Sequence, residues 1–302
     1  MQRRPPAWYD EQYNNRARIP DHPAILKYWA DASAAARAGL PDLLDVSYGD
    51  APSERLDIFP AAHAHAPVFV YLHGGYWRAL DKRDQSFIAP PLVEGGAMVV
   101  VPNYALCPAV TIEHIVLQIV RALAWVYRHA REYGGNERHI VVGGHSAGGH
   151  LAAMMLACRW TDVGTDLPAD LVKAALAISG IYDLEPIRLT PFLAPDLKLT
   201  QASARQLSPA RMPAPARGRL AAVVGGGESE EFLRQNELIR TAWGRDVVDV
   251  CERVPDRHHM NVLNDLAYSG SRLHAHARTL LGLAPAHTGG DRVGAVRALM
   301  RE

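Results

Sequence analysis

The 302-residue sequence has few of the features that mark secreted and membrane proteins. It has only three cysteines, an odd number without the spacing of a disulfide framework, which favours a reducing compartment. It contains no run of about 18 apolar residues, so no membrane-spanning helix is predicted. Its first residues, Met-Gln-Arg-Arg-Pro-Pro, lack the apolar centre of a signal peptide. We therefore expect a cytoplasmic protein without a membrane partner.

The sequence also lacks an excess of charge of either sign. Lys plus Arg and Asp plus Glu each number 32, so the formal net charge is zero. Nothing in this balance favours nucleic acid as a partner. Hydrophobic residues make up 48% and charged residues 21%, which is ordinary for a folded enzyme. This length and composition suit one large α/β domain. The oligomeric state, a homodimer included, is left open.

Apolar runs alternate with segments of helical periodicity along most of the chain. Such alternation predicts an α/β fold in which a mostly parallel sheet of about eight strands carries helices on both faces. The clearest helix covers residues 111–133, where apolar residues recur at i, i+3 and i+4 before Gly134-Gly135. The other expected helices are residues 24–38, 86–93 and 147–157. The expected strands are residues 44–48, 56–59, 68–72, 98–101, 140–142, 174–178, 220–224 and 247–250.

Two stretches depart from this alternation. Residues 184–218 contain six prolines and interrupt the pattern between the sixth and seventh strands. We expect them to form a small lid, and a long surface connection is the alternative. Residues 284–302 include Gly289-Gly290 and are expected to form a loosely ordered tail. The predicted organisation is a single domain over residues 1–283, with an N-terminal helical segment at residues 1–42.

Gly144, Ser146 and Gly148 form a Gly-x-Ser-x-Gly motif between a predicted strand and a predicted helix. A serine on such a turn stands above the sheet edge as a nucleophile, and the glycines allow the turn to be this sharp. The N–H groups at the start of the helix, that of Ala147 first, point to where an oxyanion would form. The alternative is an ordinary glycine-rich turn, or one that holds a phosphate.

A second motif, His-Gly-Gly-Tyr-Trp at residues 73–77, follows the apolar run at residues 68–72. In α/β-hydrolases a His-Gly-Gly segment after an upstream strand supplies the other half of the oxyanion hole. Gly74 and Gly75 let the backbone approach a reacting carbonyl closely, and their N–H groups would act together with that of Ala147. Two motifs in this order favour a serine hydrolase with the α/β-hydrolase fold.

A serine nucleophile needs a general base, and the base needs a carboxylate to orient it. In α/β-hydrolases these groups follow the chain order serine, acid, histidine. His258 and His259 both follow the last predicted strand, so both are candidate bases. Glu228 is the first carboxylate after the seventh strand, and Asp183, just after the sixth, is a rival acid. Glu230 lies in the first turn of a predicted helix, where it complements the helix dipole.

Several segments resemble the kynurenine formamidase (arylformamidase) group of the hormone-sensitive-lipase-like α/β-hydrolases. The resemblance implies Ser146 as nucleophile, His259 as base and Glu228 as acid, a position at which the family usually carries Asp. It also implies a small-molecule substrate, an N-formyl arylamine with N-formylkynurenine first, cleaved through an acyl-enzyme. The matching segments are residues 73–77, Asn-Tyr-Ala-Leu-Cys-Pro at 103–108, Gly-His-Ser-Ala-Gly at 144–148, Ser-Gly-Ile-Tyr-Asp-Leu at 179–184, Glu-Ser-Glu-Glu-Phe at 228–232 and His-Met-Asn-Val-Leu at 259–263.

The same machinery hydrolyses short aryl or alkyl esters, so a carboxylesterase is the runner-up. A catalytically inactive hydrolase fold used for binding is the alternative from another class. No cofactor or metal is expected, because the histidine pairs at 63/65 and 274/276 have no matching cysteine or carboxylate cluster. Four aromatic residues lie on segments expected around the substrate pocket, some of them as plain core packing. They are Tyr76, Trp77, Tyr104 and Tyr182.

Overall fold

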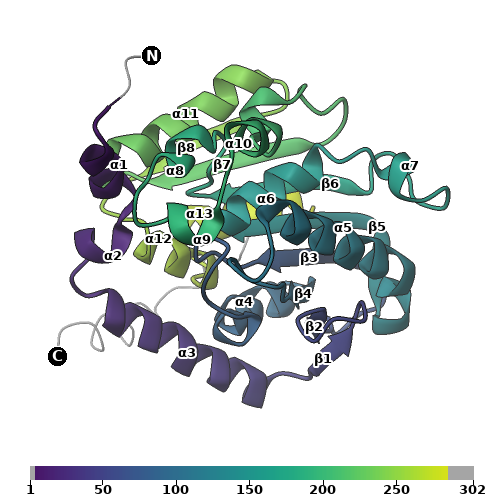
Figure 1. Ribbon diagram of the computed structural model, residues 1–302. Coiled ribbons are helices and arrows are strands. Elements are labelled where there is room, and N and C mark those ends of the chain that lie inside the picture. Colours follow the sequence, from purple (N-terminus) through teal and green to yellow (C-terminus); the bar gives the residue numbers. More distant parts are fainter. Residues whose placement is uncertain (1–3, 285–302) are drawn as a thin grey trace.

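The computed structural model describes residues 4–284 and is built on one eight-stranded sheet (Figure 1). Its strands are β1 Leu43–Ser47, β2 Arg55–Phe59, β3 Ala66–Leu72, β4 Met98–Pro102, β5 Gly135–His145, β6 Val172–Ile178, β7 Arg219–Gly225 and β8 Val250–Val254. Their order in space is β1-β2-β4-β3-β5-β6-β7-β8. β2 is antiparallel to β1 and to β4, and all other neighbours are parallel. In Figure 1 the sheet extends from β1 at the lower right to β8 at the upper left.

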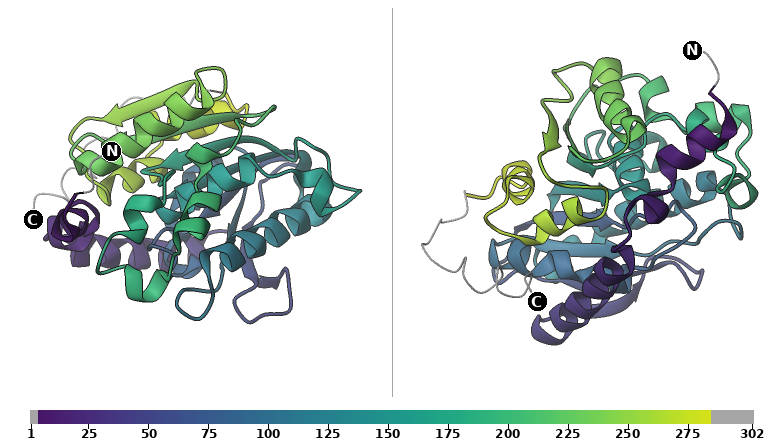
Figure 2. Two further views of the ribbon diagram at one scale, coloured as in Figure 1. Left: turned by 45° about the horizontal axis from the view of Figure 1, so that its top comes forward. Right: turned by 90° about the vertical axis from the view of Figure 1, so that its left-hand side faces the viewer.

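Helices surround this sheet (Figure 2). They are α1 Pro6–Tyr13, α2 Asn15–Arg18, α3 His22–Gly39, α4 Ala89–Glu94, α5 Ile112–His129, α6 Ala147–Leu156, α7 Trp160–Val163, α8 Glu185–Arg188, α9 Ala194–Leu197, α10 Gln201–Gln206, α11 Glu230–Trp243, α12 Asn261–Asn264 and α13 Arg272–Leu280. Short 3₁₀ helices are η1 Lys82–Asp84, η2 Ser86–Ile88, η3 Ala130–Tyr133, η4 Pro209–Arg211 and η5 Asp265–Ala267.

The strands are apolar on both faces because a hydrophobic core lies on each side of the sheet. α5, α6 and α11 pack on one face, and α3, α4, α12 and α13 pack on the other. In β3, Val68 and Val70 enter the first core, whereas Phe69 and Tyr71 enter the second. The side chains alternate in this way because successive residues of a strand point to opposite faces. The predicted mostly parallel sheet with helices on both faces is confirmed.

The last predicted strand is wrong in its position. The sequence predicts a strand at residues 247–250, but β8 begins at Val250 and ends at Val254. The apolar run before β8 packs as a connection: Val248 is fully buried, and the Val247 carbonyl accepts a hydrogen bond from the Leu220 N–H at 2.7 Å. Burial without strand pairing therefore explains the apolar residues at the start of this run.

Other boundaries differ less from expectation. The helix predicted at residues 111–133 is α-helical to His129 and continues as η3 up to Gly134, whose φ of 82° ends it. Residues 184–218 fold into α8, α9, α10 and η4. α1 and α2 were not predicted as separate helices within the N-terminal segment. The expected tail, from residue 285 onward, lies outside the described residues.

The carboxyl ends of the parallel strands β3, β5, β6, β7 and β8 lie along one edge of the sheet, since neighbouring parallel strands run in the same direction. In open α/β sheets this edge is where ligands bind. The N-terminal segment passes along the molecule from α3 to α1 in the right-hand view of Figure 2, close to α12 and to residues 184–218. These segments and the strand ends enclose the site described next.

Candidate active site

Ser146 lies at the junction of β5 and α6 in a strained backbone conformation, with φ 57° and ψ −116°. Non-glycine residues hold such angles only where the surrounding structure enforces them. The Ser146 N–H donates to the Ile178 carbonyl at 2.8 Å, which anchors the turn to β6. A Cβ on Gly148 would lie 2.0 Å from the Leu72 carbonyl oxygen, so only glycine lets α6 start this close to β3. The motif therefore forms the strand, turn and helix of a nucleophile elbow.

Ser146, His259 and Glu228 come from three different loops and form one hydrogen-bonded relay. Ser146 Oγ lies 3.1 Å from His259 Nε2. On the other side of the ring, His259 Nδ1 lies 2.6 Å from Glu228 Oε2. Because a carboxylate only accepts, Nδ1 carries the proton and donates it to Glu228. His259 Nε2 is then free to accept the hydroxyl proton of Ser146.

The carboxylate of Glu228 is held at both oxygens. Its side chain is fully buried, and Oε1 accepts from Ser179 Oγ at 2.5 Å and from the Gly225 N–H at 2.8 Å. The ring of Phe232 packs on the His259 ring, with centroids 4.3 Å apart. These contacts hold the Glu228 carboxylate and the His259 ring at a fixed distance and angle. Ser179 was not predicted as a site residue, because its place in the matching segment at residues 179–184 does not show that its hydroxyl reaches Glu228.

His145, the residue before Ser146, also contacts the relay. Its Nε2–H donates to the main-chain carbonyl of His259 at 2.7 Å. Burial first, and then the neighbouring His259, hold the pKa of His145 well below its usual range, so the ring is neutral. The edge of Trp29 from α3 packs on this ring, with centroids 6.2 Å apart. The loop that carries His259 is therefore tied to the strand that carries Ser146.

The loop after β3 brings Gly74 beside Ser146. A Cβ on Gly74 would lie 2.8 Å from the His145 carbonyl oxygen and 3.2 Å from Ser146 Cβ. Neither the Gly74 nor the Gly75 N–H donates a hydrogen bond to another residue within 4–284. Ala147 is the first residue of α6, so its N–H has no acceptor within that helix. Three N–H groups thus remain available near Ser146.

A second set of contacts holds this loop in place. The His73 ring stacks on the Tyr104 ring with centroids 4.1 Å apart, and its Nδ1 donates to the Gly74 carbonyl at 2.8 Å. The Tyr104 hydroxyl donates to the His73 carbonyl at 2.7 Å. Tyr104 was expected to line the pocket. It instead lies fully buried behind the loop, where it supports the main chain of residues 73 and 74.

A cavity of about 440 Å³ opens onto Ser146 and His259. Its walls come from residues 14–16 of the N-terminal segment, from α3 with Leu26 and Trp29, and from the loop at residues 75–80. Phe192 and Asp196, from the segment predicted as a lid, complete the lining. Sequence reasoning did not assign the N-terminal segment to the site, because α1 and α2 are short and carry no motif.

Of the four aromatic residues expected around the pocket, Tyr76 lines the cavity and the other three do not. Trp77 has a φ of 55° and is fully buried, with its edge on His150 at 5.0 Å between centroids. Tyr182 is also fully buried, and its N–H donates to Gln235. The expectation for Trp77, Tyr104 and Tyr182 is therefore corrected: these side chains pack in the core, because the loops turn them away from the cavity. His150 packs there as expected.

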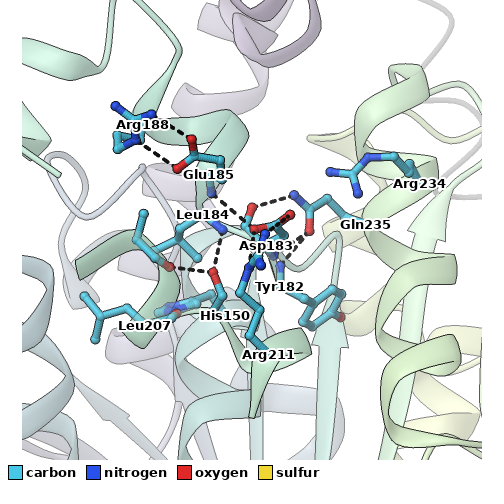
Figure 3. Close-up of polar contacts among 12 residues, drawn as sticks. His150, Tyr182, Asp183, Leu184, Glu185, Arg188, Leu207, Arg211, Arg234 and Gln235 are labelled. Carbon is cyan, nitrogen blue, oxygen red and sulfur yellow. Dashed lines mark hydrogen bonds and ion pairs between the residues drawn. The ribbon is translucent and has the colours of Figure 1, made fainter. Parts of the chain in front are cut away.

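Asp183, the rival acid, lies in a different network (Figure 3). Its Oδ1 accepts from Arg211 Nε at 3.3 Å and from the Glu185 N–H at 3.3 Å. Its main-chain carbonyl accepts from Gln235 Nε2 at 2.9 Å. These contacts connect Asp183 to η4, α8 and α11, and none of them reaches His259. The structure brings Glu228, not Asp183, to the candidate base.

Comparison with known proteins places the chain among hydrolases. The BD-FAE family model matches residues 56–190. The kynurenine formamidase of Danio rerio is 34% identical over 256 residues, which cover 82% of this chain and 84% of that protein. The esterase LipQ of Mycobacterium tuberculosis is 34% identical over 149 residues, which cover 46% of this chain and 35% of that protein.

Solved structures agree with this placement. A crystal structure from Silicibacter sp. tm1040, described provisionally as a thioesterase, has a TM-score of 0.78 and 32% identity, and the match covers 88% of this chain and 97% of that chain. An esterase from Pyrobaculum calidifontis, at 19% identity and a TM-score of 0.67 over 87% of this chain and 92% of that chain, has the same fold. Within residues 4–284, no helix combines the length and the apolar character needed to cross a membrane. The chain has the α/β-hydrolase fold, and it matches a kynurenine formamidase over more than four fifths of both chains. This protein is therefore a hydrolase of the kynurenine formamidase family.

Proposed function

We propose that this enzyme is a serine hydrolase that removes small acyl groups from aryl amides and aryl esters. N-formylkynurenine is the leading candidate for its physiological substrate. The observation that carries the proposal is the relay from Ser146 through His259 to the buried Glu228, at the floor of a cavity large enough for an aromatic leaving group. The name of the Danio rerio relative supports the choice of substrate.

In the proposed first step, Ser146 Oγ attacks the carbonyl carbon while His259 Nε2 takes the hydroxyl proton. The N–H groups of Gly74, Gly75 and Ala147 stabilise the oxyanion of the tetrahedral intermediate. The bond between the carbonyl carbon and the leaving nitrogen then breaks, and His259 passes its proton to that nitrogen. An acyl-serine remains, and the arylamine leaves.

In the second step a water molecule attacks the acyl-serine. His259 removes one proton from the water and returns it to Ser146 Oγ, so that formate leaves and the enzyme is restored. Glu228 stays ionised throughout and stabilises the imidazolium that forms twice in each cycle. The segment at residues 184–218 contributes the roof of the cavity through Phe192 and Asp196. We infer a cytoplasmic location from the three free cysteines.

A short-chain carboxylesterase is the second candidate, because LipQ and other ester hydrolases are also similar to parts of this chain. Ester cleavage uses the same relay and differs only in the leaving atom. An inactive binding protein is disfavoured, because such a protein has no need of the buried Glu228–His259 contact.

The test is a comparison of kcat/KM for N-formylkynurenine with a panel of p-nitrophenyl esters, for the wild type and for Ser146→Ala. We expect the formamide to be the better substrate, and the variant to lose at least about three orders of magnitude on every substrate while remaining folded. If the enzyme cleaves the esters but not the formamide, the carboxylesterase function replaces the formamidase function. Full turnover by folded Ser146→Ala would refute the serine mechanism.

A further inference from the structure

The two arginines that line the cavity differ in their ion pairs and hydrogen bonds. Arg78 forms an ion pair with Asp196 and donates to the Phe192 carbonyl at 3.0 Å. Its guanidinium also lies over the Phe192 ring, 5.3 Å from the centroid. The positive charge of Arg78 is therefore balanced by Asp196, and its donors hold the roof segment. The charge of Arg78 is thus already paired, although only its Nη1 makes these hydrogen bonds.

Arg16 lines the same cavity and has no such partner. Arg16 is an exposed residue, and within the part of the chain that the structure describes its guanidinium forms no ion pair and no hydrogen bond. The neighbouring His145 is neutral, because burial holds its pKa well below the usual range. The charge of Glu228 is turned toward His259 and away from the cavity. Arg16 is thus the unbalanced cation among the described residues that line the cavity.

The backbone that carries Arg16 is fixed relative to the reacting groups. Asn15 is buried, and its Nδ2 donates to the Tyr76 hydroxyl at 3.2 Å. The Tyr76 hydroxyl in turn donates to the Tyr13 carbonyl at 2.6 Å. Tyr76 directly follows Gly75, so these contacts tie α2 to the loop beside Ser146. The Cα atom of Arg16 therefore has a fixed position relative to Ser146, and its exposed side chain is free to reach a bound ligand.

We infer that Arg16 binds an anionic group, a carboxylate, on the leaving-group part of the substrate and so selects arylamine and aryl ester substrates with a carboxylate-bearing side chain. The inference rests on the proposed function in one respect, that the cavity holds the leaving group. A guanidinium offers two parallel N–H donors that match a carboxylate. The anion supplies the charge that the cavity lacks, and it also orients the aromatic ring. Arg16 is a specificity-determining residue in this scheme and takes no part in bond breaking.

The test uses two aryl acetates that differ in charge and by one methyl group: the acetate ester of 4-hydroxyphenylacetic acid and the methyl ester of the same compound. They are assayed with the wild type, Arg16→Gln, Arg16→Lys and Arg18→Gln. Arg18 is a matched control, because it lies on the same short helix and does not line this cavity. Circular dichroism and urea unfolding check that each variant is folded.

We expect Arg16→Gln to lower kcat/KM for the anionic ester by about tenfold or more, mainly through KM, since a charge-assisted contact is lost from the bound substrate. The loss for the neutral ester should be at least five times smaller. Arg16→Lys should recover part of the loss, and added salt should weaken the wild-type preference. Arg18→Gln should lower the preference for the anionic ester by less than twofold.

Equal losses for the two esters in Arg16→Gln would overturn the inference, as would an equal effect of Arg18→Gln, which would point to the general charge of the surface. The ester pair does not depend on formamide cleavage. Suppose that the enzyme discriminates between the esters through Arg16 but does not cleave N-formylkynurenine. The role inferred for Arg16 would then stand, and the proposed formamidase activity would be refuted.

Discussion

The replacement Glu228→Gln keeps the shape of the candidate acid and changes its hydrogen bonding. In the wild type, Oε1 receives the Gly225 N–H and the Ser179 hydroxyl, and Oε2 receives the proton on His259 Nδ1. A glutamine amide has one oxygen and one NH₂ group. Since the Gly225 N–H can only donate, the amide oxygen must stay on that side. The NH₂ group then faces His259 Nδ1.

This orientation forces the wrong tautomer of His259. Nδ1 has to accept from the amide, so the single ring proton moves to Nε2. That nitrogen can no longer take the hydroxyl proton of Ser146, 3.1 Å away. A wrong tautomer in a serine relay lowers kcat by about 10⁴-fold. At about 1.4 kcal/mol per factor of ten, this corresponds to about 5–6 kcal/mol in the activation free energy.

The assay is steady-state turnover of p-nitrophenyl acetate together with the size of the initial burst, at a pH well above the usual pKa of histidine. Glu230→Gln serves as the matched control, because Glu230 is an exposed carboxylate two residues away. It should retain wild-type turnover within about twofold. A folded Glu228→Gln enzyme within tenfold of the wild type would refute the tautomer argument. Greater damage from Asp183→Asn would show that the acid has been misassigned.

Three further predictions concern the acyl group of the substrate and two buried residues, Trp77 and His150. The enzyme should prefer formyl and acetyl over longer acyl groups in a p-nitrophenyl ester series from formate to octanoate, and a preference for octanoate over acetate would contradict the small-acyl assignment. Trp77→Ala should leave this preference unchanged within about twofold and lower the free energy of unfolding by about 3–5 kcal/mol, since Trp77 is a core residue. Burial lowers the pKa of His150 to about 4, so its contribution to stability is present above about pH 6.5 and is lost as the pH falls toward 4, by about 3 kcal/mol in all. Urea unfolding at pH 7.5 and 4.5 should therefore show a loss about 2–3 kcal/mol smaller in His150→Gln than in the wild type, and equal losses would exclude this role for His150.

Much of the fold could be predicted because its strands are buried on both faces. A run such as residues 68–72 is continuously apolar, and α5 repeats its apolar residues at helical spacing. α1 and α2 could not be predicted in the same way. Both are short, α1 has no apolar face at helical spacing, and both owe their positions to distant contacts, such as the hydrogen bond from the Tyr13 hydroxyl to Glu231 at 2.8 Å.

The candidate site likewise contains residues that local sequence patterns predict and residues that depend on distant contacts. Ser146, Gly74 and Gly75 lie in local motifs whose glycines are required by close backbone contacts, so a sequence reading can find them. Glu228 could be proposed from chain order alone. Ser179 and His145 could not be assigned, because each acts through one contact with a residue distant in the sequence. The pocket aromatics were misplaced because position in a loop does not determine whether a side chain points to the cavity or to the core.

The cavity wall at residues 14–16 lies outside the sheet that carries the candidate catalytic groups. In the proposed scheme, the groups that break the bond and Arg16, which selects the leaving group, come from separate stretches of the polypeptide. Exchanging a few residues of α2 for those of a relative offers a way to change which leaving groups are accepted, without touching the elbow or the relay. The same separation has a practical side. A recombinant protein trimmed back to α3, or one with a bulky affinity tag close to α1, would keep Ser146 and lose or distort one wall of the cavity. Affinity tags for this enzyme should therefore be kept at a distance from α1 by a long flexible spacer.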